Sequence, residues 1–195
     1  MIKNLVLRGF LVFCLVLSVT TLNAEDLNQN ELKQASNLID AFYSFDKHKL
    51  NTELATAESS KPLMIFYQGW AKGGNYEIIN RLPCIKTVDG NKNNDINISC
   101  SITVKDDLMG ALGIPFDVTD TFHLTFHKQV LSKVTTSSND LQVYLDAEAW
   151  VFSKRTDSVK KVCKGYFKGG PTAGDCVKAM VKGYADFAKS EDFAK

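Results

Sequence analysis

Residues 96–138 have the sequence INISCSITVKDDLMGALGIPFDVTDTFHLTFHKQVLSKVTTSS, and the expected fold is built outward from them. In its first arm every even position over 96–104 is apolar and every odd position is polar. The second arm repeats this alternation at Phe122, Leu124 and Phe126. A period of two is typical of a strand with one buried face. After a gap short enough for a hairpin turn, residues 130–136 predict a third strand, so the stretch indicates an antiparallel sheet with its even face inward.

The residues before the sheet predict helices. Asn28 and Glu31 have the spacing of a capping box, and apolar residues at helical intervals predict a helix over 29–45. Asp46 is placed to cap a short second helix. The sequence Ser59-Ser60-Lys61-Pro62 predicts the start of a third helix, which Gly73-Gly74 ends.

The residues after the sheet predict further helices. The segment Ser137–Asp140 is expected to cap a helix over 141–153, and Thr172 with Asp175 predicts the start of a last helix. Between the two strong strands, residues 107–117 are expected to form a loop that bends over a cavity. Helices, then a meander, then helices again predict the α+β class rather than alternating α/β.

The first 24 residues are typical of a secretory signal peptide. Lys3 and Arg8 supply positive charge, Leu5–Val19 is mostly apolar, and Leu22-Asn23-Ala24 offers a cleavage site. The apolar run is short for a membrane span, although an uncleaved anchor is the alternative. We therefore expect cleavage near Ala24, no stable membrane anchor afterwards, and a periplasmic or secreted protein.

The charge of the chain is nearly balanced, with 23 basic and 22 acidic residues and a formal net charge of +1. Such a balance argues against nucleic acid as a partner. One local cluster is basic, and we expect it to be a solvated helix face. It comprises Lys154, Arg155, Lys160, Lys161, Lys164 and Lys168.

Four cysteines follow the signal peptide, and an even number in that context predicts disulfides. Cys84 and Cys100 are equally far from position 92 in a turn-rich stretch, so a hairpin that closes there sets them opposite each other. Cys163 and Cys176 bracket a loop rich in glycine and proline. We expect these two local pairs. A zinc site is the alternative, but no pair has the short ligand spacing usual for zinc.

Three helices followed by a curved antiparallel sheet resemble the SnoaL-like branch of the nuclear transport factor 2-like superfamily. The most specific stretch is Asp117-Val-Thr-Asp-Thr-Phe-His-Leu-Thr-Phe126, followed by the hairpin and by Ser-Ser-Asn-Asp140. The resemblance covers residues 28–140 and implies N-terminal helices on a strongly curved sheet, a cone-like barrel with a pocket. We therefore expect a signal peptide over 1–24, an α+β domain over 25–140, and a C-terminal helical extension over 141–195 packed on the same domain.

The implied pocket lies between the helices and the inward face of the sheet. Its candidate ligand-binding residues are aromatic, and most carry one polar atom, which suits a mostly apolar pocket. They are Tyr43, Tyr67, Trp70, Tyr76 and Phe122. Aromatic residues at helical spacing also fill ordinary cores, which is the alternative.

Two acidic residues, Asp106 and Asp120, share the inward parity and are the catalytic candidates. If Val104 pairs with Asp120, the two carboxyl groups become diagonal neighbours at the mouth of the cavity. A carboxyl beside apolar walls has a raised pKa and can act as a general acid or base. The alternative is that each caps a turn at the end of its strand.

Familiar catalytic motifs are absent from the sequence: it has no serine–histidine–acid order, no phosphate-binding glycine loop and no H-E-x-x-H. His123 and His127 fall on the outward face about 13 Å apart, too far to share one metal ion. His48 lies in a polar helix and is expected to be solvated. We expect neither a metal nor a cofactor.

The leading interpretation is a domain that binds a small, largely apolar molecule, and the sequence leaves open whether it also performs acid–base chemistry of the isomerase or dehydratase kind. The alternative is a protein–protein interaction module that acts through the outer sheet face or the C-terminal helices. The outward residues suit back-to-back pairing of two sheets, so we expect a homodimer. They are Ser99, Ser101, Thr121, His123 and Thr125.

Overall fold

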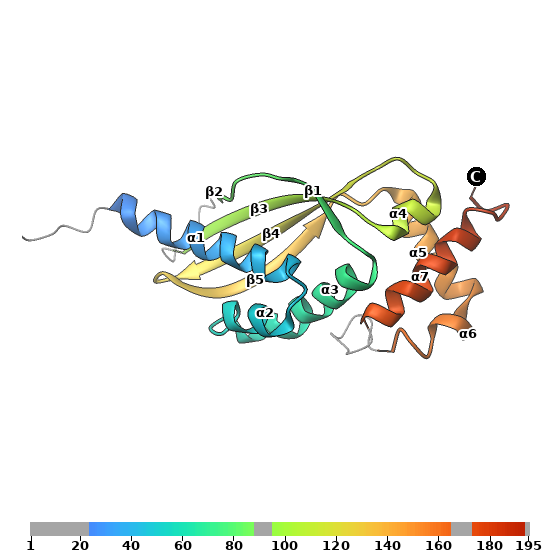
Figure 1. The fold of residues 1–195 in the computed structure, drawn as a ribbon, viewed down its shortest axis with the longest axis horizontal. Helices are drawn as coiled ribbons and strands as arrows, with labels where there is room; N and C mark the ends of the chain where they lie inside the picture. The colour runs from blue at the N-terminus through green and yellow to red at the C-terminus, as the bar shows by residue number, and fades with distance from the viewer. Residues whose placement is uncertain (1–23, 88–94, 165–172, 194–195) are drawn as a thin grey trace, which may run out of the picture.

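The structure is a computed structural model that describes residues 24–87, 95–164 and 173–193. The predicted signal peptide, apart from Ala24, lies outside these residues, as do position 92 and Lys168. The elements are, in chain order, α1 (Ala24–Tyr43), α2 (Lys47–Glu53), η1 (Glu58–Ser60), α3 (Lys61–Gly73), β1 (Glu77–Arg81), β2 (Ile85–Thr87), β3 (Ile96–Lys105), α4 (Asp107–Leu112), β4 (Val118–His127), β5 (Val130–Ser138), α5 (Gln142–Lys154), α6 (Thr156–Val159) and α7 (Ala173–Phe187). Figure 1 shows α1 crossing one face of the sheet, while α5, α6 and α7 gather with α4 at one end of the molecule.

The sheet is antiparallel, and its strands follow the order β1-β3-β4-β5, with β2 also paired to β3. The strands predicted from the alternating stretch are confirmed as β3, β4 and β5. Lys128 and Gln129 form the turn between β4 and β5 with positive φ angles of 49° and 68°, as a tight hairpin requires. The α+β class is therefore confirmed, whereas the described strands do not close into a barrel.

The two faces of the sheet differ as the alternation predicts. On β3 the side chains of Ile98, Cys100, Ile102 and Val104 are at most 1% exposed, and on β4 those of Phe122, Leu124 and Phe126 are equally buried. On the outer face, polar side chains hydrogen-bond across the strands at 3.0–3.1 Å: Ser101 with Thr121, Thr103 with Thr119, and Thr125 with Asn97. The inner face thus forms the core and the outer face stays polar.

The pairing that the sequence analysis assumed for Asp120 is wrong by two residues. Val104 pairs with Val118, and Ile102 pairs with Asp120. Residues 107–117, predicted as a loop, contain α4. Asp106 ends the extended run because its Oδ1 accepts hydrogen bonds from the first two free N–H groups of α4, at 2.7 and 2.9 Å.

The three predicted N-terminal helices are present as α1, α2 and α3, and α2 and α3 begin where their start signals predict. The capping box predicted at Asn28 is wrong, because α1 begins at Ala24 and Asn28 lies within it. Asp46 caps α2 by accepting from backbone N–H groups of its first turn. Ser60 precedes α3, but its hydroxyl does not cap that helix and instead accepts from the backbone N–H of Val134 at 2.8 Å. Gln68 is 3% exposed and donates at 3.0 Å to two carbonyls at the end of α1. These bonds hold α3 against both α1 and β5.

The C-terminal helix α7 packs against α3, α4 and α5. Glycines allow the close approach: a Cβ atom on Gly73 would lie 2.6 Å from the backbone of Gly174, and one on Gly183 would lie 2.5 Å from the side chain of Val151. The C-terminal helix α7 therefore packs into the same hydrophobic core as the N-terminal helix α3.

Both predicted disulfides are present, between Cys84 and Cys100 and between Cys163 and Cys176. The first continues the pairing of β2 with β3, in which Ile85 faces Ser99. Each closes a short loop and is expected to stabilise the fold by ~3 kcal/mol. Because disulfides persist in oxidising compartments, the pairs indicate an environment outside the cytoplasm.

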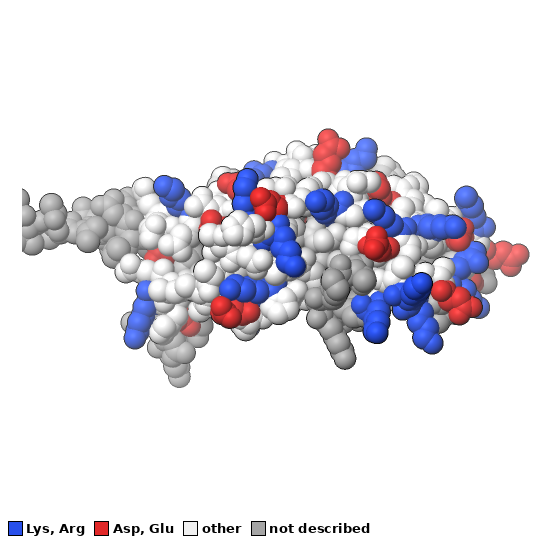
Figure 2. Space-filling model, turned by 60° about the horizontal axis from the view of Figure 1, so that its bottom comes forward, with Lys and Arg blue, Asp and Glu red and all other residues white. Residues whose placement is uncertain are grey.

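The basic cluster forms part of the surface. Its described members, Lys154, Arg155, Lys160, Lys161 and Lys164, are exposed, and Arg155 pairs with Asp186 at 3.1 Å. Figure 2 shows acidic side chains interspersed with the basic ones across this view. Among the helices of the described residues, none combines the length and the apolar character needed to cross a membrane.

Candidate functional site

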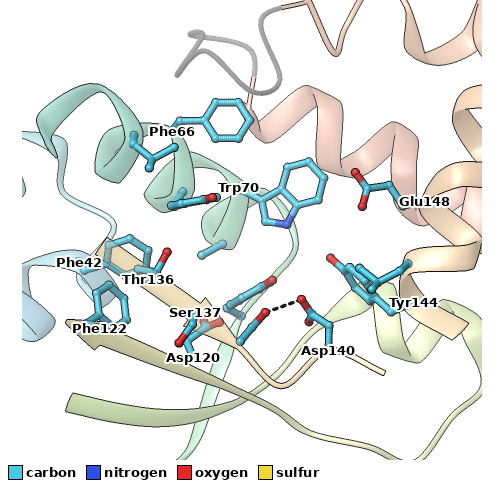
Figure 3. Close-up of a pocket in the computed structure, with 16 residues that line it drawn as sticks. Phe42, Phe66, Trp70, Asp120, Phe122, Thr136, Ser137, Asp140, Tyr144 and Glu148 are labelled. Atoms are coloured by element: carbon cyan, nitrogen blue, oxygen red, sulfur yellow. Dashed lines mark hydrogen bonds between the residues drawn. The ribbon is translucent and has the colours of Figure 1, made fainter. Parts of the chain in front are cut away.

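A cavity of about 330 Å³ lies where α3, the inner face of β4 and β5, and α5 meet (Figure 3). This volume lies at the lower end of the range for small-molecule sites. From α3 it is lined by Leu63, Phe66, Tyr67, Trp70 and Ala71. From the sheet it is lined by Asp120, Phe122, Thr136, Ser137 and Ser138. The remaining lining residues are Phe42, Tyr76, Asp140, Tyr144, Leu145 and Glu148.

Asp120 is placed in the cavity by the parity of β4, two residues before Phe122. The hydroxyl of Tyr43 donates a hydrogen bond to its Oδ2 at 3.1 Å. Burial raises the pKa of Asp120 to about 6, the Tyr43 hydrogen bond opposes this, and the charges of Asp140 and Asp106 add to it. This carboxyl can therefore gain or lose a proton close to neutral pH.

Tyr43 supports the cavity from behind and is not among its lining residues. Its ring centroid lies 5.0 Å from that of Phe42 and 6.2 Å from that of Phe122, and Phe42 and Phe122 are 4.9 Å apart, all in edge contacts. Burial and the neighbouring Asp120 raise the pKa of Tyr43, so its hydroxyl keeps its proton and acts as a donor. Tyr43 is thus a positioning residue for Asp120.

Asp106 is 4% exposed and does not line the cavity. One of its oxygens caps α4, and the other has no hydrogen-bond partner within the described residues. Burial raises the pKa of Asp106, although its two backbone hydrogen bonds act in the opposite direction. The capping alternative therefore describes Asp106, and its proximity raises the pKa values of Asp120 and Tyr76.

The prediction that Ser137–Asp140 caps α5 is wrong: Leu141 is the N-cap residue and makes no side-chain cap. Asp140 instead accepts a hydrogen bond from the hydroxyl of Ser138 and lines the cavity (Figure 3). Tyr144 and Glu148 also line it, and their four-residue spacing places them on one face of α5. Sequence reasoning missed these residues, although that spacing was a usable signal.

Tyr76 lies between the end of α3 and β1 and lines the cavity. Burial raises its pKa well above the ordinary value, and the charges of Asp106, Asp120 and Asp140 raise it further. Acidic groups from three separate segments therefore act on this one hydroxyl, which stays protonated.

The structure places the remaining candidates as follows. Tyr67, Trp70 and Phe122 line the cavity, with Tyr67 36% exposed at its edge and Trp70 7% exposed. His123 and His127 lie on the exposed outer face, where they contact Ser137 at 2.9 Å and Asp95 at 2.8 Å. Within the part of the chain that the structure describes, no three histidine, cysteine or acidic side chains lie close enough to hold a metal ion.

Comparison of the chain with protein-family models, with curated proteins and with solved structures finds no match. Relation to the SnoaL-like branch therefore stays a prediction.

Proposed function

We propose that the chain is a periplasmic or secreted protein that binds a small, largely apolar molecule in the cavity between α3, β4, β5 and α5. One observation carries the proposal: a volume of about 330 Å³ has aromatic walls and three lining acidic residues, Asp120, Asp140 and Glu148, and the pKa of Asp120 is raised to about 6. Sites for small molecules combine apolar walls with a few placed polar groups in this way.

Membership of the SnoaL-like branch is part of this proposal, and with it a sheet that curves around the ligand as a cone. Three helices before an antiparallel sheet, and a cavity between them, support it. Proton transfer is a further part. Asp120, held by Tyr43, is the group that would exchange a proton with a bound molecule.

Filling the cavity tests the proposal. Thr136 faces Phe122 across the sheet and lines the cavity. Thr136→Phe is expected to weaken binding of phenylnaphthylamine, a neutral apolar dye that fluoresces in dry pockets, by at least about tenfold, because the new ring occupies the ligand's volume. The measurement is a fluorescence titration of the purified full chain.

The neighbouring residue provides a matched control. Thr135 faces His123 on the outer side of the same strand. Thr135→Phe makes the same change away from the cavity and should leave dye binding unaltered. Equal binding by both variants, or no dye binding by the unaltered chain, contradicts the proposed site.

A second candidate function, self-association through the outer face, has its own supporting observation. The side chains of Ser99 and Ser137 both contact His123, at 3.3 and 2.9 Å, so this face carries a fixed row of polar groups. We propose that two sheets pair back to back through it. A stable interface of this kind buries about 1,200–2,000 Å² in total.

Light scattering at micromolar concentration is expected to give the mass of a dimer. His123→Glu places two carboxylates near each other in such an interface and should shift the mass to that of a monomer. His48→Glu is the control, since His48 is exposed on α2 rather than on the sheet. A monomer in the unaltered chain rejects the dimer.

A further inference from the structure

The cavity contains acidic side chains without a compensating cation from its own walls. Asp120 and Asp140 both line it, and none of the 16 described lining residues is Lys, Arg or His. Neither residue takes part in the ion pairs found among the described residues. Figure 3 shows Asp120 and Asp140 on the same side of the cavity and Glu148 directed into it from α5.

Burial disfavours the ionised form of Asp120, whose pKa is raised. A buried carboxylate is costly unless it is paired and hydrogen-bonded. Among the described residues, Asp120 receives one side-chain hydrogen bond, from Tyr43, and Asp140 receives one, from Ser138. A positively charged ligand group would supply the missing charge and the missing donors.

The opposite wall suits the same ligand charge. Phe66 and Trp70 form a stacked pair with ring centroids 6.3 Å apart, and the ring of Tyr67, which also lines the cavity, lies 6.0 Å from that of Phe66. Faces of aromatic rings attract cations, most strongly where water is excluded. They also bury the apolar part of a ligand.

We propose that the ligand is an organic cation, a protonated amine with an apolar or aromatic body, whose ammonium group lies between Asp120 and Asp140 and whose body contacts Phe66 and Trp70. This inference rests on the proposed function and names its ligand class. Aromatic walls favour an organic cation over a bare metal ion, which prefers several oxygen ligands.

A matched set of three probes tests the charge. Phenylpropylamine, phenylpropanol and phenylpropanoate share one body and are cationic, neutral and anionic at neutral pH. Each is titrated against phenylnaphthylamine bound to the full chain. The amine is expected to displace the dye at a concentration about tenfold lower than the alcohol, and the acid at a higher one, because a charge-assisted hydrogen bond is stronger than a neutral one.

The pH dependence follows from the groups that face Asp120. They are Tyr43 on α1, Tyr67 on α3, Tyr144 and Glu148 on α5, and Tyr76, Asp106 and Asp140 on connecting segments. Burial raises the pKa of Asp120 to about 6, so the carboxyl becomes neutral as the pH falls through that value. Between about pH 7 and pH 5 the amine is expected to lose about tenfold in affinity, and the alcohol much less.

Asp120→Asn isolates the charge while keeping the side chain's shape. This variant should lose most of the preference for the amine, because only Asp140 remains beside the ammonium group, and should lose its pH dependence, yet still bind the alcohol. Asp117→Asn, a change at the exposed position just before the same strand, should behave like the unaltered chain.

The outcomes separate the two proposals. Dye binding that Thr136→Phe abolishes, without any preference for the amine over the alcohol, overturns the cation inference and leaves the binding site intact. Preference for the anionic probe overturns it as well. Failure of the dye and of all three probes to bind overturns the binding site and the cation inference together.

Discussion

Phe122→Ala is expected to lower the free energy of unfolding by about 3–5 kcal/mol, the usual cost of emptying a buried phenylalanine site. Phe122 is 1% exposed and makes edge contacts with the rings of Phe42 and Tyr43. Its loss removes those contacts and leaves a void joined to the cavity. Urea denaturation of the purified variant measures the change.

Phe126→Ala is the matched comparison. Phe126 is 0% exposed on the same face of the same strand but does not line the cavity. Both variants should lose similar stability, whereas only Phe122→Ala should also alter dye binding in the fraction that stays folded. Phe122→Leu should recover most of the stability. A loss below about 1 kcal/mol for Phe122→Ala would show that its site collapses or takes up water without cost.

The sheet was predictable because its signal is local. Alternation along residues 96–104 and 122–126 fixes which side chains face inward, and those side chains are buried, apart from Ile96, which is partly buried. The symmetric placement of Cys84 and Cys100 about position 92 gave the correct pairing of β2 with β3 for the same reason. A period-two pattern identifies the buried face of a strand from neighbouring residues alone, so no distant contact has to be known.

The boundary between β3 and α4 was less predictable, because a helix cap and a strand compete for the same residue. Asp106 continues the parity of β3, so periodicity alone extends the strand, but its carboxyl stabilises the start of α4 and ends the strand at Lys105. α4 forms part of the connection between β3 and β4. Asp120 pairs with Ile102, two residues from Val104, its predicted partner. At Asp106 the hydrogen bonds of the helix cap therefore outweigh the strand propensity.

The site was predictable only in part, because its walls come from segments far apart in sequence. Tyr67, Trp70 and Phe122 were identified from residue type and parity and do line the cavity. The sequence predicts Ser137–Asp140 only as the cap of a helix, so Asp140 is not identified as a cavity residue. The spacing of Tyr144 and Glu148 places them on one face of α5, but only tertiary packing brings that face to the cavity. Tyr43, a predicted ligand-binding residue, does not line the cavity and instead donates a hydrogen bond to Asp120.

Asp120→Asn is expected to raise the free energy of unfolding at neutral pH by as much as ~3 kcal/mol, since about two pKa units separate the folded carboxyl from an unfolded aspartate. Burial raises its pKa in the folded chain to about 6, so between about pH 4 and pH 6 the folded state holds a proton that the unfolded state has released, and above pH 6 the fold contains a disfavoured carboxylate. Stability contributed by Asp120 is therefore present below the unfolded pKa of about 4 and is lost as the pH rises through 6. Asparagine keeps an oxygen for the Tyr43 hydroxyl and has no charge to bury.

Urea denaturation at several pH values measures this difference between Asp120→Asn and the unaltered chain. The gain should be largest at neutral pH and should vanish near about pH 4, where both side chains are neutral in the folded state. Asp117→Asn, at an exposed position, should show no such dependence. A destabilised Asp120→Asn chain at neutral pH, or a gain that does not change with pH, would mean that the carboxylate is well compensated within the fold. The expected gain would mean that Asp120 lowers the stability of the fold, as functional residues often do. A cationic ligand would offset the charge of this carboxylate.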